Sequence, residues 1–141
     1  MFDSVCLENP VIDLPSCFAT SDIPDWSLAQ FGVAYPFGNA PAFTPDDQYS
    51  YLKKCSPSSH LTKRLSEKTP PCMPPTLLLI GSDDLRVPKN QGIAWYHALK
   101  GHGENVRMLY YPGVGHGTSS ASIRPKMFEA ALALAVEHAN F

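Results

Sequence analysis

The sequence predicts an α/β fold in which helices flank a parallel sheet. Three short runs rich in β-forming residues alternate with stretches of helical pattern, and this order is typical of parallel strands joined by crossover helices. One run, TLLLI at 76–80, is apolar without interruption, as expected for a strand covered by helices on both faces. With 141 residues, of which 44% are hydrophobic, the chain is also long enough to form a sizeable core.

The first third of the chain is predicted to contain one strand and a long excursion. Residues 4–12 begin as a β-rich run that Asn9-Pro10 interrupts, which suits a strand running into a loop. From 13 to 43 the composition changes to Pro, Ser, Asp and aromatic residues. We interpret this segment as an excursion over the sheet, with a short helix compatible with the residues after Pro24.

A helix is predicted next, because Thr44 can act as its N-cap. Pro45 then suits the first helical position, and Asp46 and Asp47 place acids in the first turn. We expect this helix to run to about Lys54 and to be ended by the polar segment 55–59.

The second half of the chain is predicted to alternate strands and helices. The proline-rich segment 70–75 leads directly into the apolar strand, so we do not interpret it as a linker between domains. A helix is expected over 90–101, closed by Gly101. A strand at 106–111 follows, and a last helix over 123–139 carries apolar residues at helical spacing.

An acid and a histidine follow two of these strands. Asp84 lies in a turn opened by Gly81, and His116 lies in the glycine-rich loop at 111–117. The carboxyl ends of parallel strands share one edge of a sheet, so the two side chains should lie together. A carboxylate that orients an imidazole is two thirds of a Ser-His-Asp triad. Asp83 is adjacent and could compete for the role.

The serine of such a triad is the missing member. In an α/β-hydrolase the nucleophile comes first in the chain, on a GxSxG elbow, and no such pattern precedes Asp84. Ser119 lies in a superficially similar GTSSA run, but it follows the histidine and lacks an incoming strand. We therefore interpret residues 1–141 as the C-terminal half of an α/β-hydrolase domain. A complete small esterase that uses Ser119 is an alternative hypothesis.

Composition argues against several other classes of protein. The formal net charge is only -2, which gives no footprint for nucleic acid or an anionic membrane. The longest apolar runs fall far short of the roughly 20 residues of a membrane span. No signal peptide is recognisable, and the four cysteines are spaced too widely for metal-binding pairs. We expect a soluble cytoplasmic protein.

Several segments resemble one family of enzymes, the prolyl-oligopeptidase-type serine peptidases, and within it the acylaminoacyl-peptidase branch. The family's spacing Gly-x-x-Asp-x-x-Val-Pro is matched at residues 81–88, and this resemblance selects Asp84 over Asp83 as the catalytic acid. His116 matches the catalytic histidine of the family. The motif DIPDW is the part most specific to the branch. The segments that carry the resemblance are ENPVID at 8–13, TSDIPDW at 20–26, LLLIGSDDLRVP at 77–88, QGIAWYHALK at 91–100 and VRMLYYPGVGH at 106–116.

The resemblance implies an enzyme that releases N-acylated amino acids from blocked peptides without a metal or organic cofactor. It also implies that the nucleophile elbow and a propeller domain lie upstream of the segments matched here. Residues 1–141 would then supply only Asp84 and His116 and would be inactive alone, and a homo-oligomer of the full-length protein is compatible with the family. Trp26 is a weak candidate for substrate binding, since anchoring the excursion explains it equally well. The alternative is a truncated isoform that acts as a non-catalytic interaction module.

Overall fold

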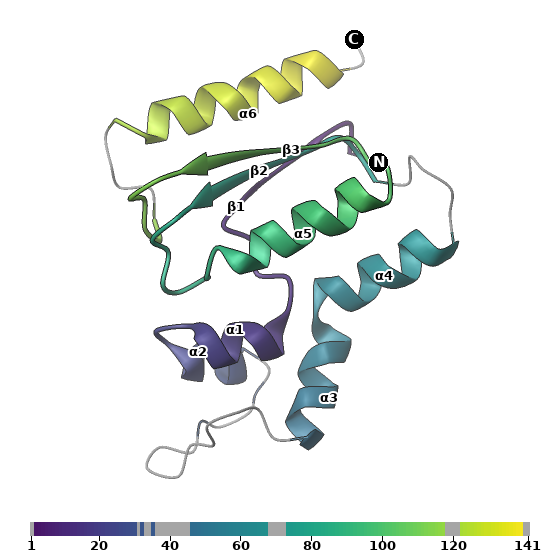
Figure 1. Ribbon diagram of the computed structural model, residues 1–141, viewed down its shortest axis with the longest axis vertical. Helices are drawn as coiled ribbons and strands as arrows, with labels where there is room; N and C mark the ends of the chain where they lie inside the picture. The colour runs from purple at the N-terminus through teal and green to yellow at the C-terminus, as the bar shows by residue number, and fades with distance from the viewer. Residues whose placement is uncertain are drawn as a thin grey trace.

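A computed structural model describes residues 2–30, 32, 35, 46–67, 73–117 and 122–139. In this part of the chain three strands alternate with helices (Figure 1). In chain order the elements are β1 (Val5–Glu8), α1 (Leu14–Thr20), α2 (Pro24–Ala29), α3 (Asp46–Cys55), α4 (Pro57–Glu67), β2 (Thr76–Gly81), α5 (Asn90–Gly101), β3 (Val106–Tyr111) and α6 (Arg124–His138).

The strands form one parallel sheet in the order β1-β2-β3. The central strand, β2, pairs Leu78 with Leu7 on one side and with Met108 on the other. Helix α6 lies over one face of the sheet and α5 over the opposite face, where α1 to α4 also lie (Figure 1). The predicted α/β fold with a parallel sheet is confirmed.

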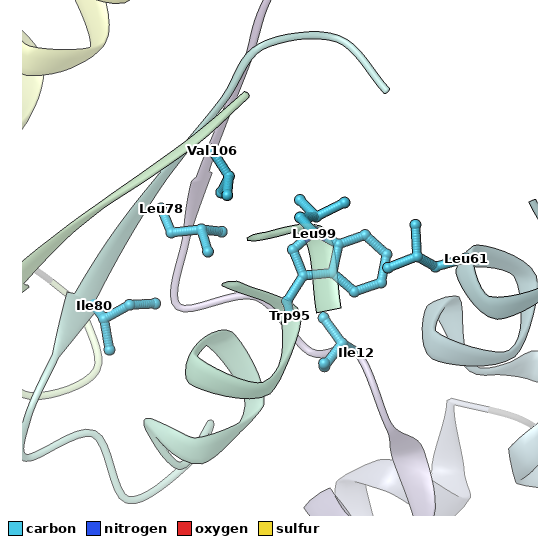
Figure 2. Packing of buried hydrophobic residues seen from close by; sticks show 7 residues of the cluster. All are labelled: Ile12, Leu61, Leu78, Ile80, Trp95, Leu99 and Val106. Carbon is cyan, nitrogen blue, oxygen red and sulfur yellow. The ribbon is translucent and has the colours of Figure 1, made fainter. Parts of the chain in front are cut away.

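Every residue of β2 is buried, because its two faces pack against different helices. On the α5 side, Leu78 and Ile80 belong to one core cluster with Trp95 and Leu99 of the helix. Figure 2 shows Trp95 between these sheet residues and Leu61 of α4. The unbroken apolar run thus has the double cover that the sequence predicted.

The opposite face of β2 packs on the last helix. Leu77 and Leu79 alternate with the residues of the first cluster and contact Met127 and Leu134 of α6. The spacing of seven between the two α6 residues corresponds to about two helical turns, so they lie on one side of the helix. This side is the buried stripe of an amphipathic helix that the sequence predicted at 123–139.

Two helices were not predicted, and both begin with a proline signal. Helix α1 starts after Asp13, whose carboxylate accepts a hydrogen bond from the Ser16 amide at 3.1 Å, and it has a proline in its first turn. Helix α4 starts at Pro57, inside the segment that we expected only to end the preceding helix. Proline suits the first position of a helix because it lacks the N–H that would be unpaired there. His60 lies on this helix.

Tertiary contacts explain why the helical backbone is interrupted between α3 and α4. Ser56, at the junction, is fully buried, and its hydroxyl accepts a hydrogen bond from the Leu14 amide at 2.9 Å. The same hydroxyl donates to the Leu52 carbonyl at 2.7 Å. The end of α3 and the start of α1 thus share one buried polar group.

Helix α5 ends at Gly101, as predicted, but another glycine makes the turn that follows it. His102 keeps a helical backbone, and Gly103 adopts a left-handed φ of 83°. Gly92, near the start of the helix, serves close packing, because a Cβ there would lie 2.2 Å from Cδ1 of Ile80. Of the helices that the structure describes, none is long and apolar enough to cross a bilayer.

Candidate active site

The acid turn begins where β2 ends, and its backbone is tied to the loop after β3. The amide of Ser82 donates to the Tyr111 carbonyl at 3.0 Å, and the amide of Asp83 donates to the Val114 carbonyl at 2.9 Å. A Cβ on Gly81 would lie 2.4 Å from the same Val114 oxygen. Only glycine allows the two loops to approach this closely, so the sequence of the turn fixes the distance between them.

The carboxylate of Asp84 is buried and anchored by the turn. Its side chain is 0% exposed. Its Oδ1 accepts hydrogen bonds from the amides of Arg86 at 3.0 Å and Val87 at 2.9 Å. These two donors fix the carboxylate plane and leave Oδ2 for another partner.

That partner is His116, from the loop after β3. Its Nδ1 lies 2.9 Å from Oδ2 of Asp84, and 43% of the imidazole side chain is exposed. A proton on Nδ1 satisfies this hydrogen bond and makes Nε2 the basic nitrogen. The arrangement can therefore accept and return a proton at Nε2, the chemistry of a general base and acid.

Asp83 occupies a different environment from Asp84. It is exposed, and its Oδ1 accepts a hydrogen bond from the hydroxyl of Ser82. That hydroxyl in turn accepts from the amide of Gly113 at 2.8 Å. Of the two adjacent acids, the structure brings Asp84 to the imidazole and leaves Asp83 at the surface.

Asn9 also contacts the acid turn, although the sequence analysis considered this residue only as the end of a strand. Its Oδ1 accepts a hydrogen bond from the amide of Gly81 at 2.8 Å. The local signal was visible as an Asn-Pro pair after a β-rich run, but the partner lies 72 positions away. The pair therefore could not be found from spacing.

The other side of the acid turn contacts α1 and the segment between α1 and α2. The amide of Asp22 donates to the Leu85 carbonyl at 2.9 Å, and Sγ of Cys17 lies 3.8 Å from the Arg86 carbonyl. Trp26, the weak substrate-binding candidate, lies on α2 and is 38% exposed. Its role in binding stays a prediction.

Some residues named in the sequence analysis lie outside the described part of the chain. Ser119 and the rest of 118–121 fall outside the described part, as does Thr44. Within it, no group of three or more His, Cys, Asp or Glu residues could hold a metal ion.

The sequence of the chain matches a known protein family. The model of the prolyl oligopeptidase family matches residues 1–141. The acylamino-acid-releasing enzyme of Mus musculus is 36% identical over 126 residues, which cover 89% of this chain and 16% of the mouse protein. The chain thus spans less than a fifth of the length of that relative.

Solved structures share the fold. An acylaminoacyl peptidase of Pyrococcus horikoshii superimposes with a TM-score of 0.63 at 25% identity, covering 94% of this chain and 19% of that one. An esterase of Thermogutta terrifontis superimposes with a TM-score of 0.59 at 19% identity, covering 96% of this chain and 42% of that one. The second likeness concerns the fold alone.

Proposed function

The chain belongs to the prolyl oligopeptidase family of serine peptidases and has the α/β-hydrolase fold, and from this premise we propose that Asp84 and His116 are the acid and base of a peptidase active site. The observation that carries the proposal is the 2.9 Å hydrogen bond between a fully buried carboxylate and a half-exposed imidazole. The two side chains come from loops at the carboxyl ends of neighbouring parallel strands, the edge at which ligands bind in open α/β sheets.

The proposed reaction uses the two residues in fixed roles. Nε2 of His116 takes the proton of a serine hydroxyl as the serine oxygen bonds to the substrate carbonyl carbon. The peptide bond breaks, and the imidazolium gives its proton to the leaving amine. A water molecule then repeats the sequence on the acyl-enzyme, and the serine regains its proton. Asp84 stays ionised throughout and stabilises the imidazolium.

The serine of this reaction is proposed to lie on a segment other than residues 1–141. The chain covers only 16% of the mouse relative. In the α/β-hydrolase order the nucleophile elbow precedes the acid, and this order supports residues 1–141 being the C-terminal portion of a larger hydrolase domain. Loss of a nucleophile of this kind lowers turnover by about 10⁶-fold. The 141-residue chain by itself is therefore expected to be inactive, with its activity residing in the complete natural polypeptide that contains it.

The relatives support a proposal for the substrate class. The mouse protein is an acylamino-acid-releasing enzyme, and the DIPDW segment resembles that branch of the family. We therefore propose N-acylated peptides as substrates, cleaved after the first, acylated residue. This reaction requires no metal or organic cofactor.

The experiment compares two chromogenic substrates that differ only at the amino group. The complete natural polypeptide should hydrolyse N-acetylalanine p-nitroanilide and leave alanine p-nitroanilide, with its free amine, largely intact. Comparable rates on both substrates, or hydrolysis of the free amine alone, would exclude the proposed substrate class. The Asp84 and His116 variants described in the Discussion test the catalytic roles separately.

One observation favours a second candidate, a non-catalytic interaction module. Strand β1 is an edge of the described sheet, with Cys6 and Glu8 exposed, and the neighbouring helix α6 exposes Phe128, Leu132 and Val136 at intervals of four residues. An open strand edge beside an apolar row favours association. Pull-down of full-length subunits by the 141-residue chain at fixed stoichiometry would support this function, whereas a chain that stays a stable monomer would argue against it.

A further inference from the structure

Asn9 has an unusual backbone conformation at the point where β1 ends. Its φ is 39°, and among the described residues it is the one non-glycine residue with a positive φ. It is also buried, with 9% of its surface exposed. Asn and Asp enter the left-handed region more readily than other side chains. A residue held there inside the protein needs compensating contacts.

The contacts of Asn9 continue the hydrogen-bond ladder between β1 and β2, but the last bond uses its side chain. The amides of Val5 and Asn9 donate to the carbonyls of Pro75 and Leu79, as in a regular parallel ladder. The same ladder would next take the Gly81 amide to the main-chain carbonyl of Asn9. Instead, the amide donates to the side-chain Oδ1 of Asn9 at 2.8 Å. The side chain thus replaces the backbone at the last rung, while the left-handed turn sends the chain away toward Pro10.

Gly81 is consequently held from two sides. On one side its amide donates a hydrogen bond to the side chain of Asn9. On the other side the Val114 carbonyl lies so close that a Cβ on residue 81 would not fit. The next residues, Ser82 and Asp83, bond through their amides to β3 and to the histidine loop. Asp84 follows at once, so the position of its carboxylate depends on where β2 ends.

We infer that Asn9 is a positioning residue for the proposed acid: its side-chain carbonyl fixes the end of β2 and thereby holds Asp84 in register with His116. The inference rests on the proposed function for its catalytic consequence. Without the acceptor, the buried Gly81 amide can regain a partner only if the turn shifts. A misplacement of about 1 Å at a catalytic group costs on the order of 100-fold in rate.

Three substitutions separate the side chain from the backbone. Asn9→Gly keeps access to the left-handed conformation but removes the acceptor, Asn9→Asp keeps both, and Asn9→Ala removes the acceptor and strains the backbone. In the complete natural polypeptide we expect Asn9→Gly to lower kcat by about 10- to 100-fold with little change in KM. Asn9→Asp should stay close to the wild type, and Asn9→Ala should fall at least as far as Asn9→Gly.

Amide hydrogen exchange gives a readout that does not need activity. The Gly81 amide should exchange faster in Asn9→Gly than in the wild type or in Asn9→Asp, because of these three proteins only the glycine variant lacks the acceptor. Wild-type kcat in Asn9→Gly, equal losses in Asn9→Gly and Asn9→Asp, or unchanged Gly81 exchange would each overturn the inference. A wild-type polypeptide without activity on acetylated substrates would instead overturn the proposed function, and the exchange measurement would still decide the role of Asn9 at the turn.

Discussion

Nδ1 of His116 lies 2.9 Å from Oδ2 of Asp84, and the two side chains differ completely in their access to solvent. The carboxylate is 0% exposed and the imidazole 43% exposed. A reactant can therefore reach the histidine, whereas Asp84 can act only through it. This division suits an acid that orients and a base that transfers the proton.

The first prediction concerns the choice between the adjacent acids. Asp84→Asn should lower kcat of the complete natural polypeptide by about 10⁴-fold, because an amide favours the wrong imidazole tautomer. The new side chain keeps an oxygen for the Arg86 and Val87 amides, so the turn should persist. Asp83→Asn is the matched control and should change kcat little, since Asp83 is exposed and bonds to Ser82. A larger loss in the Asp83 variant would reverse the assignment.

The second prediction tests the close approach of the two loops. Gly81→Ala should lower the free energy of unfolding by about 3 kcal/mol, since its Cβ would lie 2.4 Å from a backbone oxygen that cannot rotate away. Gly101→Ala is the control, because a Cβ there meets nothing within 4 Å. Alanine at this helical position should stabilise by up to about 1 kcal/mol. Urea unfolding of both variants checks this, and equal stabilities would contradict the packing described.

The third prediction is a pH dependence of stability at Asp13. Burial opposes ionisation of this carboxyl group, but hydrogen bonds from Lys53, the Ser16 amide and Ser58 outweigh it, so its pKa lies below the ordinary value. A depressed folded-state pKa stabilises the fold above the ordinary value, and the contribution is lost as the pH falls through the folded-state pKa.

Asp13→Asn should therefore be less stable than the wild type near pH 6, and the difference should shrink as the pH falls below about 4. Urea unfolding midpoints across this range measure the effect. Lys53→Met removes one of the hydrogen bonds and should reduce the pH dependence of an otherwise wild-type chain. A gap between wild type and Asp13→Asn that stays constant down to pH 2 would refute the assignment.

The fourth prediction contrasts two leucines of α6. Leu134 is 4% exposed and packs on β2, whereas Leu132 is 52% exposed. Leu134→Ala should destabilise the 141-residue chain by about 2–5 kcal/mol through loss of packing and a residual cavity. Leu132→Ala should change stability by less than about 0.5 kcal/mol. Similar losses in the two variants would show that α6 packs through a different face.

Much of the fold was predictable because its signals are local. The run TLLLI identified the central strand without a structure, since an apolar segment of this length needs cover on both faces. The helices α1 and α4 were not predicted, because the local signals at their starts are ambiguous. Pro57 follows a helix and precedes another, and the local sequence does not distinguish ending from starting. The buried bond between Ser56 and the Leu14 amide, 42 positions apart, is what organises the junction.

The site was predictable in part. The family resemblance is confirmed by the family match and by the mouse relative, and the acid preferred from the motif is the one that contacts His116. The catalytic roles themselves stay predictions. Asn9 was missed because its significance lies in a left-handed φ and a distant amide, neither of which is encoded in residue spacing.

The most direct measurement compares two histidine variants of the complete natural polypeptide on N-acetylalanine p-nitroanilide. His116→Ala should lower kcat by on the order of 10⁶-fold, as expected when the general base of a serine triad is removed. His60→Ala, on the exposed surface of α4, should retain wild-type activity. A His116→Ala variant that hydrolyses this substrate at the wild-type rate would contradict the assignment of Asp84 and His116 as acid and base.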